Sequence, residues 1–163
     1  MTERIFETPF GSLLLMALGD SLIYCNWIND DCRRKEERIR RKYADMQLEG
    51  EECTLEESEK QLKEYFNGDR TIFDLKVKTE GTNFQEEVWK VLKLISYGTT
   101  VTYTDLSRMM KKPRACRAIA NACGSNPIAI IQPCHRVVGK TGIGGYTGGL
   151  DKKVSLLNLE KSI

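Results

Sequence analysis

The chain has 163 residues, of which 40% are hydrophobic and 29% are charged. This length suits one compact protein or two small lobes, and it supplies enough apolar residues for a core. Residues 1–8 are too charged for a secretory signal, and no apolar run is long enough to cross a bilayer. We therefore expect an intracellular, cytoplasmic protein (nuclear in a eukaryote) without a membrane partner.

The net charge of +2 hides an uneven distribution. Residues 1–80 carry 13 Lys/Arg against 18 Asp/Glu, whereas residues 81–163 carry 12 against 5. Between residues 98 and 150 the only acid is Asp105, against seven Lys/Arg. Such an excess of positive charge is typical of surfaces that meet phosphate groups. The sequence predicts an N-terminal α/β lobe over 1–80 and a basic C-terminal lobe over 81–163 whose surface meets phosphate groups.

The first part of the chain predicts a small sheet. Residues 3–8, 12–18 and 21–28 are rich in β-branched, aromatic and aliphatic residues and are separated by turns that contain glycine. These segments predict a three-stranded antiparallel meander. A charged helix is expected next, over residues 31–43. Its cations alternate with acids, which favours a solvated face over a nucleic-acid contact.

Two more helices are predicted from end signals and spacing. Thr54 and Glu57 match the capping-box pattern, so we expect a helix over residues 54–66. Residues 75–77 form a short extended link. Over residues 82–95 the apolar side chains recur at helical spacing, which indicates a helix that faces a core.

The segment after residue 98 predicts a helix-turn-helix. A short helix over residues 104–110, begun by Thr102 or Thr104, is broken at Pro113, and a second helix follows over residues 114–123. Two short helices joined by a tight turn in a basic region are typical of this motif. The second helix is thin because of its alanines, Ala115, Ala118, Ala120 and Ala122. Helix pairs of this kind also occur in cores, so DNA binding and simple packing both stay open.

The sequence Pro133-Cys134-His135-Arg136 places the only histidine of the chain beside a cysteine. A neighbouring imidazole or guanidinium favours the thiolate, which is the nucleophilic form of cysteine. An apolar run over 128–131 precedes the pair and a glycine-rich segment over 139–145 follows it, which indicates a pocket around a buried sulfur. A structural cysteine beside a surface histidine would fit the same pattern, and both interpretations stay open.

Six cysteines in a chain without a secretory signal predict thiols rather than disulfides. The chain has no Cys-x-x-Cys motif, and its single histidine lies beside the candidate nucleophile. We therefore expect no metal site and no cofactor.

Several segments, taken in order, resemble the O6-alkylguanine-DNA alkyltransferase family, the methylated-DNA:protein-cysteine methyltransferases. These segments are Thr102-Tyr103, Arg117-Ala118-Ile119, Asn126-Pro127, Pro133-Cys134-His135-Arg136-Val137, Gly145-Tyr146-Thr147-Gly148-Gly149-Leu150, and Leu156-Leu157 with Glu160. The resemblance is specific over residues 83–160 and general over 1–80. It implies an α+β fold: an RNase H-like N-terminal lobe with a three-stranded antiparallel sheet and helices, and a mainly helical, winged-helix-like C-terminal lobe.

The resemblance implies a DNA repair protein. Such a protein flips O6-alkylguanine out of double-stranded DNA, which it enters from the minor groove, and transfers the alkyl group irreversibly to Cys134. O4-alkylthymine is a candidate minor substrate. Each molecule would transfer one alkyl group and would act as a monomer. Its binding to DNA must supply the few kcal/mol that extrusion of the base costs.

The resemblance also assigns chemical roles. Cys134 is the nucleophile and alkyl acceptor, and His135 is the general base, acting through a water because adjacent side chains point apart. Glu160 orients the imidazole. Asn126 ties the active-site turn to the backbone around the sulfur. Tyr103 donates a proton toward guanine N3 and crowds the DNA backbone.

Other roles implied by the resemblance concern DNA and the substrate. Arg117 enters the base stack in place of the extruded nucleotide. Further DNA contacts are expected from Thr102, Ala118, Arg114 and Arg136. The alkylguanine pocket is expected to be lined by Val137, Gly145, Tyr146 and Thr147.

The chain departs from the family pattern at Gln132, where an apolar residue is usual, and at Ser125, where a basic residue is common. It also lacks the zinc-binding histidines that some relatives carry in the N-terminal lobe. Two other classes remain open. A DNA-binding regulator would have no use for a Cys-His-Glu set, and a cysteine hydrolase would turn over and ignore DNA.

Overall fold

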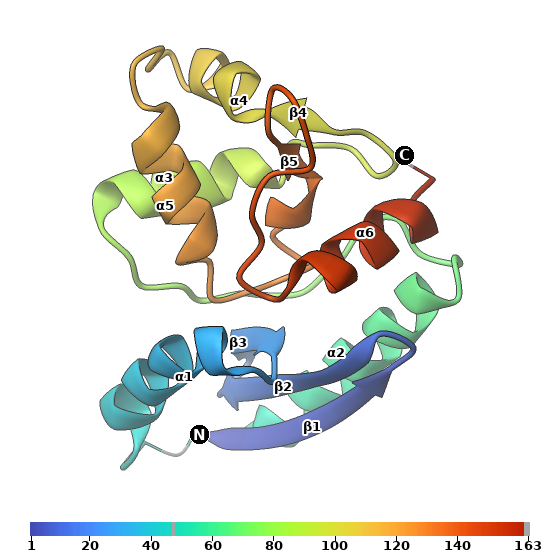
Figure 1. The fold of residues 1–163 in the computed structure, drawn as a ribbon. Helices are drawn as coiled ribbons and strands as arrows, with labels where there is room; N and C mark the ends of the chain where they lie inside the picture. Colours follow the sequence, from blue (N-terminus) through green and yellow to red (C-terminus); the bar gives the residue numbers. More distant parts are fainter. Residues whose placement is uncertain (47, 162–163) are drawn as a thin grey trace. The chain divides into compact units, whose positions relative to one another are not determined.

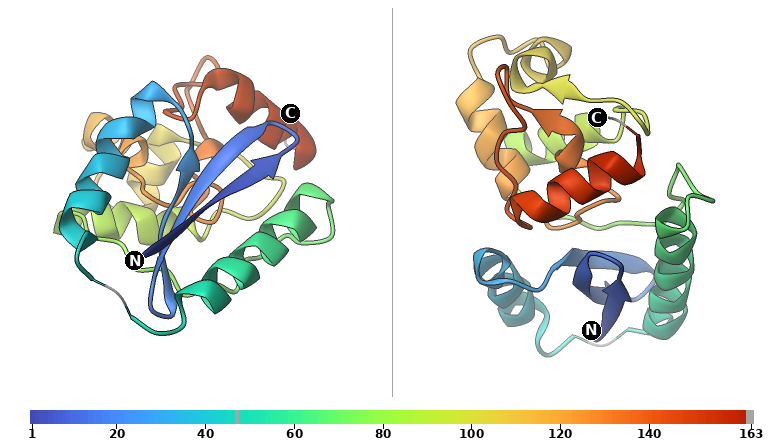
Figure 2. Two further views of the ribbon diagram at one scale, coloured as in Figure 1. Left: turned by 90° about the horizontal axis from the view of Figure 1, so that it is seen from below. Right: turned by 45° about the vertical axis from the view of Figure 1, so that its right-hand side comes forward.

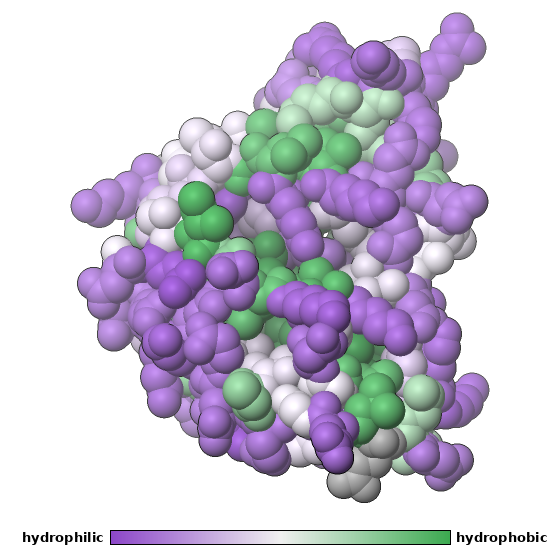
Figure 3. Space-filling view, turned by 180° about the vertical axis from the view of Figure 1, so that it is seen from behind, coloured by the Kyte–Doolittle hydropathy of each residue, from purple (hydrophilic) through white to green (hydrophobic). Residues whose placement is uncertain are grey.

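The computed structural model describes residues 1–46 and 48–161, and the chain divides after Thr79 into two compact units (Figure 1). Each unit has a hydrophobic core of its own. Charged and polar side chains cover most of the face drawn in Figure 3, with smaller hydrophobic patches between them. Mixed α+β architecture is confirmed as the fold class.

The N-terminal unit is built on an antiparallel sheet with the strand order β1-β2-β3. The strands are β1 (Thr2–Thr8), β2 (Gly11–Leu18) and β3 (Ser21–Trp27). The register places Leu15 opposite Cys25, and a bulge lies between Met16 and Ala17. The predicted meander is thus confirmed, and its strand ends differ from the prediction by one residue. Strand β3 is buried along its whole length, so side chains on both of its faces are covered.

Two helices pack against this sheet, as Figures 1 and 2 show. Helix α1 (Asp30–Tyr43) begins where the Asn29 side chain accepts a hydrogen bond from the amide of Cys32, at 2.8 Å. It buries Cys32, Ile39 and Tyr43 and leaves most of its cations exposed. The residues after the second helix, α2 (Glu51–Phe66), return to the sheet, where Val77 forms a parallel bridge with Leu22.

Helix α2 (Glu51–Phe66) begins three residues earlier than predicted. Its first residue, Glu51, is buried and accepts a hydrogen bond from the amide of Leu48. Its carboxylate also pairs with the N-terminal ammonium group. Thr54 therefore lies inside the helix, where its hydroxyl donates to the carbonyls of Gly19 and Gly50 rather than capping an end. The capping box predicted for Thr54 and Glu57 is wrong because tertiary contacts of Glu51 extend the helix.

The C-terminal unit contains most of the remaining helices. Its elements are α3 (Asn83–Leu92), β4 (Val101–Thr102), α4 (Tyr103–Met109), α5 (Cys116–Gly124), the short 3-10 turn η1 (Cys134–Arg136), β5 (Val137–Val138) and α6 (Leu150–Leu159). Thr82 caps α3 in a capping box with Gln85. Trp89 of α3 is fully buried, and its indole donates to the carbonyl of Ala122 in α5 at 2.8 Å. This bond fixes the thin helix on the core.

Helices α4 and α5 form the predicted pair of short helices and pack against each other. Thr102 and Asp105 form a capping box at the start of α4. Helix α5 begins at Cys116, two residues later than predicted, after a turn in which Lys111 has a φ of 56°. Strands β4 and β5 pair in parallel, with Val101 opposite Val137. The segment after η1 is therefore held beside the segment that leads into α4.

Candidate active site

Cys134 is the first residue of η1, and the backbone before it is folded back tightly. Buried Ile130 has a φ of 70°, a left-handed conformation that is unfavourable for a β-branched residue. The Asn126 side chain stabilises this turn by accepting from the amide of Ile128 at 3.0 Å and donating to the carbonyl of Gln132 at 2.8 Å. The same Nδ2 atom lies 3.3 Å from Cys134 Sγ. One amide side chain therefore holds both the turn and the sulfur.

A cavity of about 320 Å³ opens at Cys134, which is 8% exposed. This volume is at the lower end of the range of small-molecule sites. The cavity is lined by Tyr103, Ala120, Asn121, Cys123, Gly124, Cys134, Gly145, Tyr146 and Thr147. The Thr147 hydroxyl donates to the carbonyl of Gly124 at 3.1 Å, so the glycine-rich loop is tied to the end of α5.

The position of Val137 differs from the expected one. The resemblance places this residue in the pocket wall, but its side chain is fully buried in the core of the unit together with Leu106 and Ile119. The reason is that Val137 belongs to β5, which pairs with β4 against that core. The expectation for its side chain is therefore corrected.

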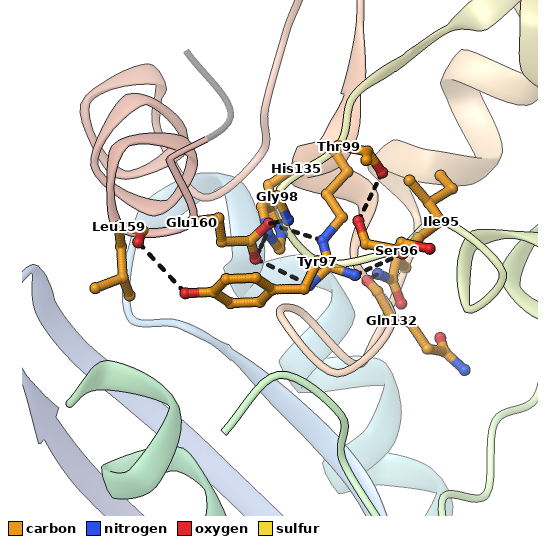
Figure 4. A network of polar contacts seen from close by, with 11 residues as sticks. Ile95, Ser96, Tyr97, Gly98, Thr99, Gln132, His135, Leu159 and Glu160 are labelled. Carbon is orange, nitrogen blue, oxygen red and sulfur yellow. Dashed lines mark hydrogen bonds and ion pairs between the residues drawn. The ribbon is translucent and has the colours of Figure 1, made fainter. Parts of the chain in front are cut away.

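His135 is fully buried, and its Nε2 atom lies 2.8 Å from the carboxylate of Glu160, the residue that ends α6 (Figure 4). A carboxylate can only accept, so Nε2 carries the proton and Nδ1 carries the lone pair. Within the described residues the buried Nδ1 atom has no hydrogen-bond partner. Burial lowers the pKa of His135 more than the carboxylate raises it, so the imidazole is neutral near pH 7. It is therefore in the proton-accepting form.

Glu160 is 2% exposed and accepts hydrogen bonds from both His135 and Arg136. Arg136 donates to it twice, from Nε at 2.9 Å and from Nη2 at 3.0 Å. The amide of Gly98 lies 3.5 Å from the Glu160 carboxylate, and Figure 4 shows Glu160 beside Gly98 and His135. Burial alone would raise the pKa of Glu160, but the hydrogen bonds from His135 and Arg136 outweigh it and bring the pKa to about 2.

Arg136 corrects a second expectation. It is predicted as a DNA contact, yet it is only 5% exposed. Besides its two bonds to Glu160, its Nη1 atom donates to the carbonyl of Ile95 at 2.6 Å. The guanidinium is thus occupied inside the protein, where it holds Glu160 as an anion. The other expected arginines, Arg114 and Arg117, are exposed and form no ion pair within the part of the chain that the structure describes.

The remaining predicted DNA residues lie around α4 and α5. Ala118 is exposed on α5, next to Arg117. Thr102 is half-buried, and its hydroxyl bonds to Asp105 at 2.6 Å as part of the cap of α4. Helix α5 has no side-chain cap and no acid in its first turn. Unpaired amides at such an end suit a phosphate group.

Tyr103 is half-buried at the mouth of the cavity. Burial, followed by the charges of Cys123 and Cys134, raises its pKa to about 12, so the phenol keeps its proton near pH 7. Gly144 has a φ of 72°, and an added Cβ atom there would lie 3.3 Å from the Tyr103 ring. The loop can therefore pass this close to the phenol only with glycine at that position.

Two features of the site were not predicted from the sequence. Cys123 is buried and lines the same cavity as Cys134. Lys153 is fully buried on α6, where its Nζ atom donates to the carbonyls of Val137 at 2.6 Å and Gly145 at 3.1 Å. The signal for Lys153 was its position three and four residues before Leu156 and Leu157, on the same helical stripe. Within the described residues, no group of three or more His, Cys, Asp or Glu side chains could hold a metal ion.

Comparisons with known proteins cover nearly the whole chain. Residues 83–162 match the model of the 6-O-methylguanine DNA methyltransferase DNA binding domain, and residues 1–79 match that of its ribonuclease-like domain. A methylated-DNA–protein-cysteine methyltransferase of Methanosarcina acetivorans is 43% identical over 163 residues, which is 99% of each chain. A probable one of Acanthamoeba polyphaga mimivirus is 52% identical over 101 residues, 61% of this chain and 68% of that protein.

A solved structure is similar as well. The crystal structure of Mycobacterium tuberculosis OGT in complex with DNA has a TM-score of 0.83 and 37% sequence identity. The match covers 98% of this chain and 92% of the M. tuberculosis chain.

Proposed function

Because the chain belongs to the 6-O-methylguanine DNA methyltransferase family, we propose that it repairs DNA by moving an alkyl group from guanine O6 to the Sγ atom of Cys134. The cavity that opens at Cys134 is the main support for this residue as the alkyl acceptor. The wall of this cavity contains the Cys134 thiol, which is held by Asn126 and is adjacent in sequence to a buried imidazole with a proton-accepting nitrogen.

The reaction is a displacement at the alkyl carbon. The Cys134 thiolate attacks this carbon, a C–S bond forms, and the C–O6 bond breaks with its electron pair going to guanine. Tyr103, which keeps its proton near pH 7 because burial raises its pKa, then gives this proton to N3, so that the base leaves neutral. The phenolate takes up a proton from water and the His135 imidazolium releases one, so that the thiol proton is transferred overall to guanine. The product is a neutral thioether together with unmodified guanine.

The thiolate forms by proton transfer to His135. The proton of the thiol passes through a water to Nδ1, because the two side chains are adjacent in sequence and Nδ1 is the nitrogen with the lone pair. The imidazolium that results is stabilised by Glu160, which stays ionised because Arg136 donates to it twice. Arg136 is thus a supporting residue for the base.

DNA binding is assigned to α4 and α5. Exposed Arg114 and Arg117 and the uncapped start of α5 offer donors to phosphates, and exposed Ala118 lets the helix approach closely. We propose entry through the minor groove, with Arg117 filling the space of the extruded base. A guanine within a base stack cannot reach a thiol that is 8% exposed, which supports extrusion.

We propose that each molecule transfers one alkyl group, that it acts as a monomer, and that it lies in the compartment that holds the cell's DNA. Water does not reverse the transfer, because breaking the C–S bond of the thioether would require an alkyl thiolate, a poor leaving group, to depart. Each repair event therefore consumes one molecule.

The test is to incubate the protein with a duplex that contains O6-methylguanine and to measure its intact mass. A gain of one methylene group, located on the Cys134 peptide and absent in Cys134→Ala, is the expected result. No gain would leave a DNA-binding regulator as the better interpretation. Repeated turnover without an adduct would instead indicate a cysteine hydrolase.

A further inference from the structure

Lys153 is a cation in the interior that has no carboxylate partner. Its side chain is 0% exposed, and within the described residues it forms no ion pair with an Asp or Glu. The carboxylate of the same unit that is buried with it, Glu160, is already bonded to His135 and Arg136. Burying an ammonium group is costly unless an opposite charge or several dipoles compensate it.

The hydrogen bonds of Lys153 join three segments around the thiol. Its Nζ atom, from α6, donates to the carbonyl of Val137 just after η1 and to the carbonyl of Gly145 in the pocket loop. Gly145 lines the cavity, and Val137 is three residues from Cys134. The ammonium therefore ties the loop to the turn that carries the nucleophile.

The ionisable groups whose negative charges act on Lys153 are thiols. Burial lowers the pKa of Lys153 to about 8, while Cys134 first and Cys123 second act to raise it. Cys123 is a poor source of negative charge, because burial raises its thiol pKa far above neutral pH. The acid that can supply a counter-charge in this interior is Cys134.

We propose that Lys153 is a positioning residue for the reaction described above, in which its ammonium is the counter-charge of the Cys134 thiolate and holds the pocket loop in place. This inference rests on the proposed function. Alkyl transfer converts the thiolate into a neutral thioether, and the negative charge leaves with guanine, where the Tyr103 proton neutralises it. The buried ammonium then loses its counter-charge, so repair removes one of the interactions that hold the loop.

The first experiment follows the reactivity of Cys134 against pH. Iodoacetamide needs neither DNA nor the substrate pocket, and its adduct on Cys134 is located by peptide mass mapping. In Lys153→Met the midpoint of the rate–pH profile should move upward by about one pH unit, because removing a nearby cation disfavours the thiolate. Lys153→Arg, which keeps the charge, should hold the midpoint near that of the wild type even if the rate falls. Lys152→Met, at the more exposed neighbouring lysine, is the matched control and should leave the profile unchanged.

An unchanged midpoint in Lys153→Met would overturn the proposal, since a purely structural loss lowers the rate at every pH. A second measurement does not depend on that variant being folded. In Cys134→Ser, NMR of isotope-labelled lysine side chains should show Lys153 titrating at lower pH than in the wild type; equal titration would overturn the pairing. Both readouts are separate from repair, so a failure of the proposed function appears only in the assay with O6-methylguanine DNA.

Discussion

Replacement of Glu160 by glutamine tests whether the anion at the end of α6 stabilises the site. The substitution keeps the size of the side chain but removes the charge that Arg136 and His135 contact at 2.8 to 3.0 Å. It leaves the buried guanidinium of Arg136 with the carbonyl of Ile95, the ring of Tyr97 and an uncharged amide as partners. We expect Glu160→Gln to destabilise the C-terminal unit.

The magnitude follows from the pKa. The pKa of Glu160 moves from 4.5 to about 2 on folding, which corresponds to about 3 kcal/mol at about 1.4 kcal/mol per pKa unit. Removing one partner of a buried ion pair costs about 3 to 5 kcal/mol, in agreement. Because the folded pKa is the lower one, this stabilisation is complete above about pH 4.5 and is lost as the pH falls toward 2. The free energy of unfolding of the wild type should therefore fall more steeply below pH 5 than that of the variant.

Urea unfolding, followed by the fluorescence of Trp89 in a Trp27→Phe background, isolates the C-terminal unit. The difference between wild type and Glu160→Gln should be about 3 kcal/mol at pH 7 and should shrink between pH 5 and 3. Burial lowers the pKa of His135, which also makes stability fall with acidification, but this contribution has the same sign in both proteins. Equal stability at pH 7, or parallel curves below pH 5, would refute the reasoning.

Three further predictions concern repair. With excess O6-methylguanine duplex, the amount of repaired DNA should stop rising at one equivalent of the protein, and Cys134→Ala should bind this DNA without transfer of the methyl group. Continued release of repaired DNA would contradict the prediction that each molecule acts once. Arg117→Ala should slow repair of the duplex more than reaction with free O6-benzylguanine, because only the duplex must extrude a base. Equal slowing of the two reactions in a kinetic comparison would argue against the place of Arg117 in the base stack. Methylation of Cys134 should lower the melting temperature, because an added carbon overpacks a close-packed site by about 1 to 3 kcal/mol, or about 2 to 4 °C per kcal/mol, and a benzyl adduct should lower it further. Equal or rising midpoints in thermal melts of the three forms would mean that the cavity has room to spare.

The parts of the fold that depend on local patterns were predictable from the sequence. The strands of the meander follow from their β-branched, aromatic and aliphatic residues and from the turns that contain glycine between them. Helix α3 follows from the helical spacing of its apolar residues, and its Thr82–Gln85 cap needs no distant partner. The capping-box pattern at Thr54 predicted the wrong start for α2, because Glu51 begins this helix and is held there by the N-terminal ammonium group and the amide of Leu48. Local sequence patterns predict a helix end correctly where the hydrogen bonds that fix this end lie within one turn of the helix.

The residues of the site divide in a similar way. The motif around Cys134 and the carboxylate of Glu160 could be identified from the resemblance. Whether a Lys or Arg side chain contacts DNA or forms contacts inside the protein depends on its burial, which is set by the packing of the whole unit. Arg136 was expected on the surface and instead completes a buried ion pair. The helical spacing of Lys153 from Leu156 and Leu157 marks the buried face of α6, but the packing of the helix on its core was needed to show that the ammonium group itself is buried.

The left-handed backbone at Ile130 has a consequence for the order of folding. An isoleucine does not adopt this conformation by itself, so the turn before Cys134 depends on Asn126, which in turn is positioned by the end of α5. Helix α5 must therefore be docked before the nucleophile acquires its surroundings. We therefore expect the Cys134 thiol to have ordinary reactivity in any state of the chain in which α5 is not docked. Pulse labelling of thiols during refolding, with Cys134 reaching its native reactivity after Trp89 is buried, is the observation expected from this order.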